Sequence, residues 1–294
     1  MQSIPSLYAA FDLFPSAKGA ATHIYHFSRA MFAFTGGGTL LTLGSADMPA
    51  YQEEGGAKVY RFRGQIPNYL ARAQAYSGFV AGAVRRMPGL RLAHYRDIWG
   101  ALPVLHHCTR CATVFEVNAL PSVELPYRYP YLPGATLAKI RKLEDEALSR
   151  SQRIVVPSGV IGTMLQRRGV GPEKITRITN GAVLPSPQPR PEGLPGPYII
   201  YFGALQPWQG VDVLLKAFAG LRDFQGLKLL ICSSNRPRYA KLFRKLAEKL
   251  GITADVVWKF QLPQTELNAC LQHAVVSVAP LKETARNIAQ GCSP

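Results

Sequence analysis

Short apolar runs alternate along the chain with longer stretches whose apolar positions recur at helical spacing. In the first part, strands are predicted at SLYAAF, GTLLTLG, KVYRFRG, LRLAHYR, ATVFEV, RIVVPS and KITRITNG. Between the first two, Ile24, Phe27, Met31 and Phe34 recur every three or four residues, which predicts a helix. Further helices are predicted at Tyr69 to Arg86, TLAKIRKLEDEALSRS and VIGTMLQRRG. This alternation is typical of an α/β domain.

The segment VLPSPQPRPEGLPGP interrupts the alternation with six prolines and predicts a linker. The alternation then restarts, with strands predicted at YIIYFG, LKLLIC, DVVWKF and AVVSVAP and a helix beginning at Gln264. We therefore predict two doubly wound, Rossmann-like domains at residues 1–183 and 198–294, joined by a linker at 184–197. The sequence ends at LKETARNIAQGCSP, directly after the fourth strand, so we expect the second domain to be incomplete.

Two turns between a strand and a helix are candidates for phosphate binding, because the first turn of a helix offers free N–H groups. The first turn is FPSAKGAATH, with Lys18, Gly19 and Ala20. The second begins the stretch GALQPWQGVDVLLKAFAGL and contains no Lys or Arg between Gly203 and Val213. Either turn could equally be an ordinary packing turn. In doubly wound sheets, ligands bind beyond the carboxyl ends of the strands, so a cleft between the domains is the expected site.

Several segments together carry a resemblance that covers nearly all of the 294 residues. They are SAKGAATHIYHFSRAM, FEVNALPSVELPYRYP, EDEALSRSQRIVVPS, KITRITNGAVL, YFGALQPWQGVDVLLKAF and VVWKFQLPQTELNACLQHAVVSVAPL. Each is loose alone, but their order and spacing are specific. The chain resembles the retaining glycosyltransferases of family 4, which have the two-domain GT-B fold.

The resemblance implies transfer of a sugar from a nucleotide-activated donor to an acceptor, with retention of anomeric configuration. The donor would lie against the second domain and the acceptor against the first. The loop from Lys18 to Thr22 would border the donor diphosphate, Phe260 and Gln261 match the segment that meets the nucleotide base, and Glu266 starts the following helix. Relatives commonly stabilise the leaving diphosphate with protein groups, so no metal or other cofactor is expected.

The chain departs from the family pattern where two cations usually hold the donor phosphates. Ala204 and Gln209 occupy those positions, and a neutral amide makes a weaker bond to phosphate than a cation does. Two alternatives remain. Either backbone N–H groups and the side chains of Lys18, Lys282 and Arg286 bind the donor phosphates, or the phosphate contacts are lost. The family's acidic donor motif would lie near or beyond residue 294.

Glu116 occupies the place of a histidine that the family often has near the reacting sugar. It could orient the acceptor hydroxyl or act as a base, or it could be a structural carboxylate at a strand end. His94, also at a strand end, is the second catalytic candidate, with Arg96 and Asp97 beside it. His106 to Cys111, read HHCTRC, has metal-binding residue types but no second pair nearby, so a metal site is not predicted there.

The formal net charge is +16, from 34 basic and 18 acidic residues. This excess suits phosphorylated small molecules, an anionic membrane or nucleic acid. A cluster from Arg236 to Lys249 predicts one helix with Leu242, Leu246 and Leu250 in an apolar row; its basic side is either a solvated surface or a contact with an anionic surface. No nucleic-acid-binding motif is present. Five scattered cysteines and the lack of a signal peptide or long apolar run favour a cytoplasmic location.

The leading hypothesis is a cytoplasmic glycosyltransferase that binds a nucleotide sugar and a glycan or lipid-linked acceptor, in peripheral contact with an anionic membrane. The alternative is an inactive remnant that binds nucleotide sugar weakly or not at all, motivated by the missing cations and the early end. A charge-driven nucleic-acid binder is the least favoured hypothesis.

Overall fold

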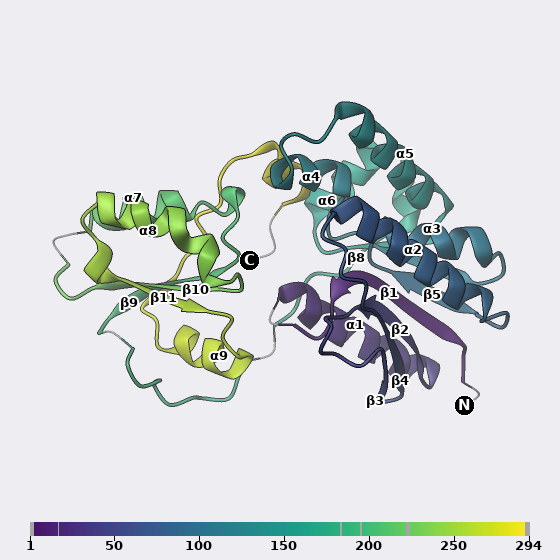
Figure 1. Ribbon diagram of the computed structural model, residues 1–294, viewed down its shortest axis with the longest axis horizontal. Coiled ribbons are helices and arrows are strands. Elements are labelled where there is room, and N and C mark those ends of the chain that lie inside the picture. The colour runs from purple at the N-terminus through teal and green to yellow at the C-terminus, as the bar shows by residue number, and fades with distance from the viewer. Residues whose placement is uncertain (1–2, 17, 183, 195, 222–223, 292–294) are drawn as a thin grey trace. The chain divides into compact units, whose positions relative to one another are not determined.

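The computed structural model describes residues 3–16, 18–182, 184–194, 196–221 and 224–291. The chain divides into two compact units, coloured purple to teal and green to yellow in Figure 1. The first is built from Met1–Asn180 together with Ala289–Gly291, and the second from Gly181–Ile288. The predicted linker falls within the second unit, and its described residues contain no helix or strand.

The first unit has an eight-stranded sheet in the order β3-β4-β2-β1-β5-β6-β7-β8. All neighbours pair in parallel except β3 and β4. Strand β1 lies between β2 and β5, where the order reverses, so ligands are expected beyond its carboxyl end. The strands are β1 (Ser6–Leu13), β2 (Gly38–Leu43), β3 (Tyr51–Glu54), β4 (Ala57–Phe62), β5 (Leu92–Tyr95), β6 (Ala112–Glu116), β7 (Arg153–Val156) and β8 (Ile175–Arg177).

Helices cover both faces of this sheet. Helix α1 packs on one face, where Tyr8 and Ala10 of β1 meet Ile24 and Phe32. The other face, with Leu7 and Ala9, is covered by the remaining helices of the unit. This alternation along β1 is the two-residue period of a strand that is buried on both sides. The helices are α1 (Gly19–Thr35), α2 (Tyr69–Arg85), α3 (Ile98–His107), α4 (Pro121–Arg128), α5 (Gly134–Arg150) and α6 (Gly159–Arg167).

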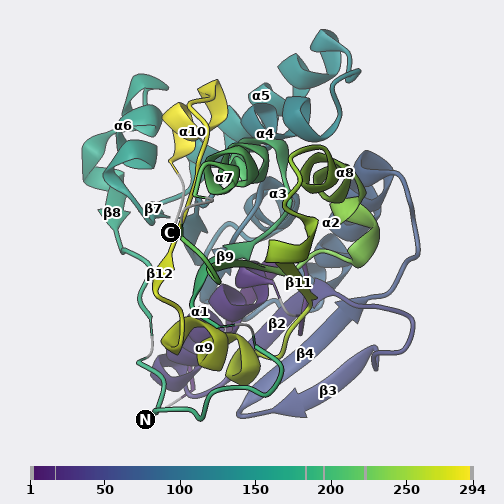
Figure 2. The ribbon, with the colours of Figure 1, turned by 90° about the vertical axis from the view of Figure 1, so that its left-hand side faces the viewer.

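The second unit has a four-stranded parallel sheet in the order β11-β10-β9-β12. Helices α7 and α8 lie on one face and α9 on the other (Figure 2). Gly203, Ser233 and Phe260 stand in register at the carboxyl ends of β9, β10 and β11. The elements are β9 (Tyr198–Gly203), α7 (Val211–Ala219), β10 (Lys228–Ser233), α8 (Lys241–Lys249), β11 (Val256–Phe260), α9 (Gln264–Gln272), β12 (Val276–Ser277) and α10 (Ala285–Gln290).

Four elements were not predicted from the apolar pattern. Strand β3 has the sequence YQEE, which lacks apolar alternation, and it forms by antiparallel pairing with β4 at the sheet edge. Helix α3 is buried nearly all round and contains Pro103, so its sequence shows no amphipathic period. Helices α4 and α10 are short, with 8 and 6 residues, and give little periodic signal.

Two of the apolar residues at helical spacing are exposed. Phe34 is 65% exposed, because α1 buries the stripe of Ile24, Ser28 and Phe32 and directs Phe34 outward. Leu242 is 76% exposed, because α8 packs Phe243, Leu246, Ala247 and Leu250 inward. Within the described ranges, no helix combines the length and the apolar character needed to cross a bilayer.

The two phenylalanines near the end of α1 give a matched test of this packing. We expect Phe32→Ala to lower the free energy of unfolding of the first unit by about 3–5 kcal/mol, because the ring is 4% exposed in the core. Phe34→Ala should change it by less than about 0.5 kcal/mol. Urea unfolding followed by circular dichroism measures both, and equal losses would contradict the orientation of α1.

Candidate active site

A buried carboxylate lies at the carboxyl end of β6 in the first unit. Glu116 is 1% exposed and lies between the sheet and α1. Its oxygens are approached by Tyr8 Oη (2.6 Å), Asn118 Nδ2 (2.5 Å), His94 Nε2 (3.1 Å), Arg96 Nε (3.1 Å) and His23 Nδ1 (2.8 Å). The His23 contact is close but lacks the direction of a hydrogen bond, so we treat it as a polar contact. The charge of Glu116 is thus compensated from β1, β5 and α1.

The surroundings of Glu116 keep it ionised. Burial alone would raise its pKa, but the contacts from His23 and His94 and the charge of Arg96 outweigh burial and hold the pKa well below its usual range. Burial and the same carboxylate raise the pKa of Tyr8 well above its usual value, so the phenol remains a hydrogen-bond donor. A carboxylate with so many donors and a low pKa is a poor proton acceptor.

Strand register explains how the cluster forms. Tyr8 of β1 pairs with His94 of β5, and both side chains point to the α1 face; their rings lie 4.7 Å apart. Arg96 and Glu116 follow on the same face, as the two-residue period requires. Asp97 points to the other face, where it accepts hydrogen bonds from Gly100 N (2.8 Å) and Phe11 N (2.6 Å) and caps α3.

Arg96 connects the buried cluster to more open groups. Its Nη1 lies 3.1 Å from Asp12 Oδ2 and 3.3 Å from the carbonyl oxygen of Ala20 in the first turn of α1. The side chain of Asp12 is 41% exposed, unlike that of Glu116. Burial by the surrounding protein raises the pKa of Asp12, and the charges of Arg96 and Lys18 only partly oppose this rise. Asp12 is therefore the more accessible and more basic of the two carboxylates.

The predicted loop residues Lys18, Gly19 and Ala20 lie at the start of α1. Lys18 precedes the first helical residue, and its carbonyl accepts from Ala21 N (2.9 Å) and Thr22 N (3.3 Å). The first turn has no acidic residue and no side-chain cap, so its N-terminal partial charge is uncompensated by the helix itself. A side chain at Gly19 would meet no atom within 4 Å, so the turn is open there.

An aromatic cluster lies at the same edge of the sheet, on the face opposite α1. It joins residues from the end of β1, the starts of α2 and α3, and the segment after α4. The centroids of neighbouring rings in the cluster lie 5.6–6.5 Å apart. The guanidinium groups of Arg128 and Arg72 lie 5.9 and 6.0 Å from the centroid of the Tyr69 ring. The members are Phe11, Tyr69, Trp99 and Tyr129, with Arg72 and Arg128 above them.

In the second unit, the turn after β9 packs tightly against the segment after β12. Gly210 has a φ of 72°, and a side chain there would come within 1.7 Å of the Pro280 carbonyl oxygen. Only glycine satisfies both constraints. Gly203 also has a positive φ, of 148°. The 3₁₀ turn η2 (Pro207–Gln209) leads into α7, and Gln209 N donates to Gln206 O (3.0 Å).

The turn contains no cationic residue, but Lys282 and Arg286 from the segment after β12 contact it. The backbone N–H of Lys282 donates to Trp208 O (3.1 Å), and its Nζ lies 2.8 Å from Asp212 Oδ2. The guanidinium of Arg286 lies 4.8 Å from the centroid of the Trp208 ring. Asn287 Nδ2 also donates to Trp208 O (3.0 Å). The segment after β12 thus places the guanidinium of Arg286 against the cation-free turn, whereas the charge of Lys282 is paired with Asp212.

The remaining predicted donor residues lie at the end of β11. Gln261 has a φ of 51°, in the left-handed region, and its N–H donates to Ser233 O (2.7 Å). Glu266 is paired with Lys259 (3.0 Å). The Phe260 ring is parallel to that of Trp258 and packs on the α7–α8 side. Because sheet strands are spaced by about 4.8 Å, Phe260 and Gly203 are roughly 10 Å apart at one edge.

The structure identifies site residues that the sequence analysis did not select. His23 contacts Glu116, and its Nε2 lies 2.8 Å from Asn180 Oδ1. Asp12 was not considered. Their common signal is position: Asp12 is the last residue but one of β1, and His23 lies in the second turn of the following helix.

The HHCTRC segment holds other contacts. His106 pairs with Glu146 (2.8 Å), and Cys111 Sγ donates to Cys108 O (3.7 Å). Burial raises the pKa of Cys111 to about 12, so its thiol stays protonated. Across the described residues, no three His, Cys, Asp or Glu side chains are grouped to hold a metal ion.

Removing the buried charge tests the role of Glu116. We expect Glu116→Gln to lower the free energy of unfolding by about 3 kcal/mol at neutral pH, since Arg96 loses its buried counter-charge. Because the folded pKa is depressed, this contribution is complete above the unfolded pKa of about 4.5 and disappears as pH falls through the folded pKa.

Unfolding titrations at a series of pH values, with exposed Glu192→Gln as the control, measure this difference. A wild-type advantage that persists unchanged in strong acid would contradict the ionised state of Glu116.

Comparison with known proteins identifies the family. Residues 17–184 match the model described as Glycosyltransferase Family 4, and residues 186–284 match the model described as Glycosyl transferases group 1. No curated protein matches the sequence significantly.

Solved structures share the fold at low identity. Sucrose-phosphate synthase from Thermosynechococcus elongatus is 16% identical, with a TM-score of 0.74 over 95% of this chain and 75% of its own. WaaG, a glycosyltransferase involved in lipopolysaccharide biosynthesis, is 15% identical, with a TM-score of 0.72 over 96% and 76%. Anabaena HepE in complex with UDP and glucose is 13% identical, with a TM-score of 0.65 over 93% and 73%.

These likenesses confirm the predicted α/β architecture of two Rossmann-like units, the second with the smaller sheet. Since the Family 4 model alone spans more than half of its residues, the chain belongs to glycosyltransferase family 4 and has the GT-B fold.

Proposed function

We propose that the protein transfers a sugar from a nucleotide-activated donor to a glycan or lipid-linked acceptor, with retention of configuration. The observation that carries this proposal is the second-unit turn from Gly203 to Gly210, which has no cation of its own but has the guanidinium of Arg286 against its Trp208 ring. An inactive remnant that does not bind the donor would not need a positive charge next to this turn. Two similar structures were solved with nucleotides, Anabaena HepE with UDP and Arabidopsis starch synthase IV with ADP.

Donor binding would use the carboxyl edge of the second sheet. The diphosphate would accept hydrogen bonds from N–H groups at the start of α7, with Gln209 as a neutral donor and Arg286 and Lys282 as cations. Gln261 and Phe260 would border the base, and Glu266 would lie next to this segment. The leaving diphosphate would then be stabilised by fixed protein groups.

Acceptor binding would use the carboxyl edge of the first sheet. Sugar rings stack on aromatic faces, and Tyr69 and Tyr129 of the aromatic cluster supply partly exposed rings at this edge. We assign Asp12 to accept the hydrogen bond of the acceptor hydroxyl, because its side chain is open to solvent and is held in place by Arg96. Glu116 and His94 would support this site from its buried side, where Glu116 fixes the orientation of His94 and Arg96.

Arg286 gives the direct test of the donor site. We expect Arg286→Gln to weaken nucleotide-sugar binding roughly tenfold or more, because a charge-assisted contact becomes neutral. Calorimetry with a panel of uridine, guanosine and adenosine diphosphate sugars measures this, with the exposed Arg238→Gln as the matched control. Equal affinity of the Arg286 variant and the control would refute the assignment, and no binding by the wild type would favour the inactive-remnant alternative.

Gln209 tests the same turn in the opposite direction. We expect Gln209→Lys to fold normally, because the half-buried side chain follows an ordinary 3₁₀ turn, and to bind the donor several-fold more tightly at low salt. Thermal unfolding checks the first expectation, and donor titration at two salt concentrations checks the second. Loss of folding, or weaker binding at low salt, would show that Gln209 does not face the phosphates.

A further inference from the structure

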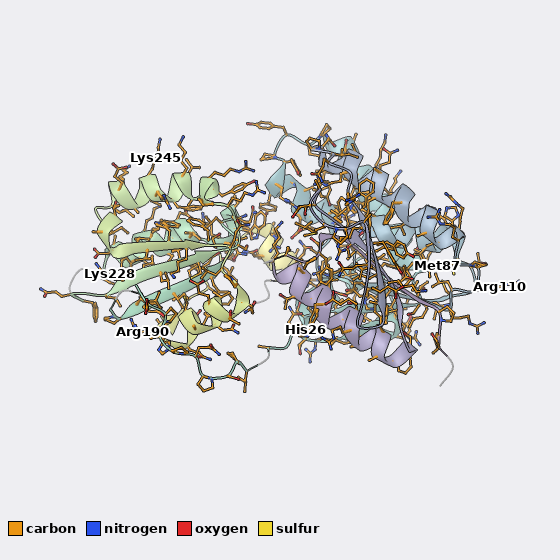
Figure 3. The ribbon with its side chains drawn as sticks, turned by 60° about the horizontal axis from the view of Figure 1, so that its bottom comes forward. His26, Met87, Arg110, Arg190, Lys228 and Lys245 are labelled. Carbon is orange, nitrogen blue, oxygen red and sulfur yellow. The ribbon has the colours of Figure 1, made fainter. Side chains whose placement is uncertain are left out.

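One helix of the second unit has a strongly basic outer side. We call it the α8 basic face; it belongs to α8 and to the residues just before it, including the 3₁₀ turn η3 (Pro237–Ala240). It contains six exposed cations and one exposed carboxylate, that of Glu248. Figure 3 shows the labelled Lys245 pointing away from the sheet. The cations are Arg236, Arg238, Lys241, Arg244, Lys245 and Lys249.

The α8 basic face lacks the ion pairs that neutralise cations elsewhere. In the first unit, Arg150 pairs with Glu146 and Arg168 with Glu144. Among the described residues of the second unit, the ion pairs join Lys228 to Asp255, Lys259 to Glu266 and Lys282 to Asp212, so none involves α8. Its positive charge is available to an external anion.

Part of the α8 basic face forms a shallow groove of about 520 Å³. Its lining residues are Pro237, Lys241, Arg244, Lys245, Glu248 and Thr253. The guanidinium of Arg244 lies 5.8 Å from the Trp258 ring and 5.7 Å from the Phe260 ring, so its position is held from below. Three cations that converge on one groove are suited to a phosphate group.

Two large apolar side chains stand among these cations. Leu242 is 76% exposed and Tyr239 is 51% exposed. Leu242 precedes Lys245 and Lys249 by three and seven residues, so all three lie on one side of the helix. A free phosphate or a nucleic acid backbone offers no apolar phase for Leu242, whereas a bilayer offers phosphates at its surface and acyl chains beneath.

We propose that the α8 basic face docks the protein on an anionic lipid bilayer. The cations contact lipid phosphates, and Leu242 and Tyr239 enter the headgroup region. Lys241, Lys245 and Lys249 of this surface are not among the residues assigned to donor binding, so the two surfaces can be tested separately.

The test is flotation of the full chain with vesicles of phosphatidylcholine alone and with phosphatidylglycerol added. We expect binding only to the anionic vesicles, and a roughly 100-fold loss of affinity for Lys241→Glu/Lys245→Glu/Lys249→Glu, since each basic residue contributes several-fold. The matched control, Arg85→Glu/Arg86→Glu/Arg91→Glu, changes the net charge equally at exposed positions of the first unit and should still bind. Circular dichroism and donor affinity should be unchanged in both variants.

Leu242→Ser separates a bilayer from other anions. We expect it to weaken vesicle binding several-fold without changing the response to pyrophosphate or duplex DNA. Equal binding by wild type and Leu242→Ser, equal binding to neutral vesicles, or undiminished binding by the α8 triple variant would each overturn the proposal. Tighter binding to DNA than to anionic vesicles would also overturn it.

Discussion

A buried negative charge organises the first unit. An ionised carboxylate without partners is very costly inside a protein, so Glu116 is stable only where several donors reach it. Those donors come from β1, β5 and α1, which are far apart in the sequence. Their convergence fixes the direction of the Arg96 side chain. Through Arg96, the same charge orients Asp12 and the start of α1 at the open edge.

The second unit meets a different constraint, the close approach of two loops. Gly210 and the Pro280 carbonyl leave no room for a side chain, so the turn after β9 and the segment after β12 are in direct backbone contact. This contact brings Lys282 and Arg286 to a turn that precedes them by some seventy residues. The turn itself has no cation, and Arg286 supplies one beside it from the segment after β12.

The sequence predicted the fold well because strands buried on both faces are short apolar runs, as in SLYAAF and YIIYFG. The prediction missed α3, because this helix is buried on nearly all sides and its apolar residues show no periodic spacing. It also missed β3, because this strand forms through pairing with β4 and has no apolar alternation. Site prediction reached Glu116 and His94 because each ends a strand. Their shared contact depends on strand register, and the contact of His23 depends on the rotation of α1; neither can be derived from local sequence. The roles predicted for the individual site residues remain predictions.

The ionisation state of Glu116 tests the account most directly. The carboxyl ¹³C resonance of Glu116, assigned by its absence from Glu116→Gln, can be followed by NMR as pH is lowered. The structure predicts a resonance of an ionised carboxylate that persists well below the usual glutamate pKa of about 4.5. A midpoint at or above that value would contradict it, because the buried charge of Arg96 would then lack the ionised partner that the structure assigns to it.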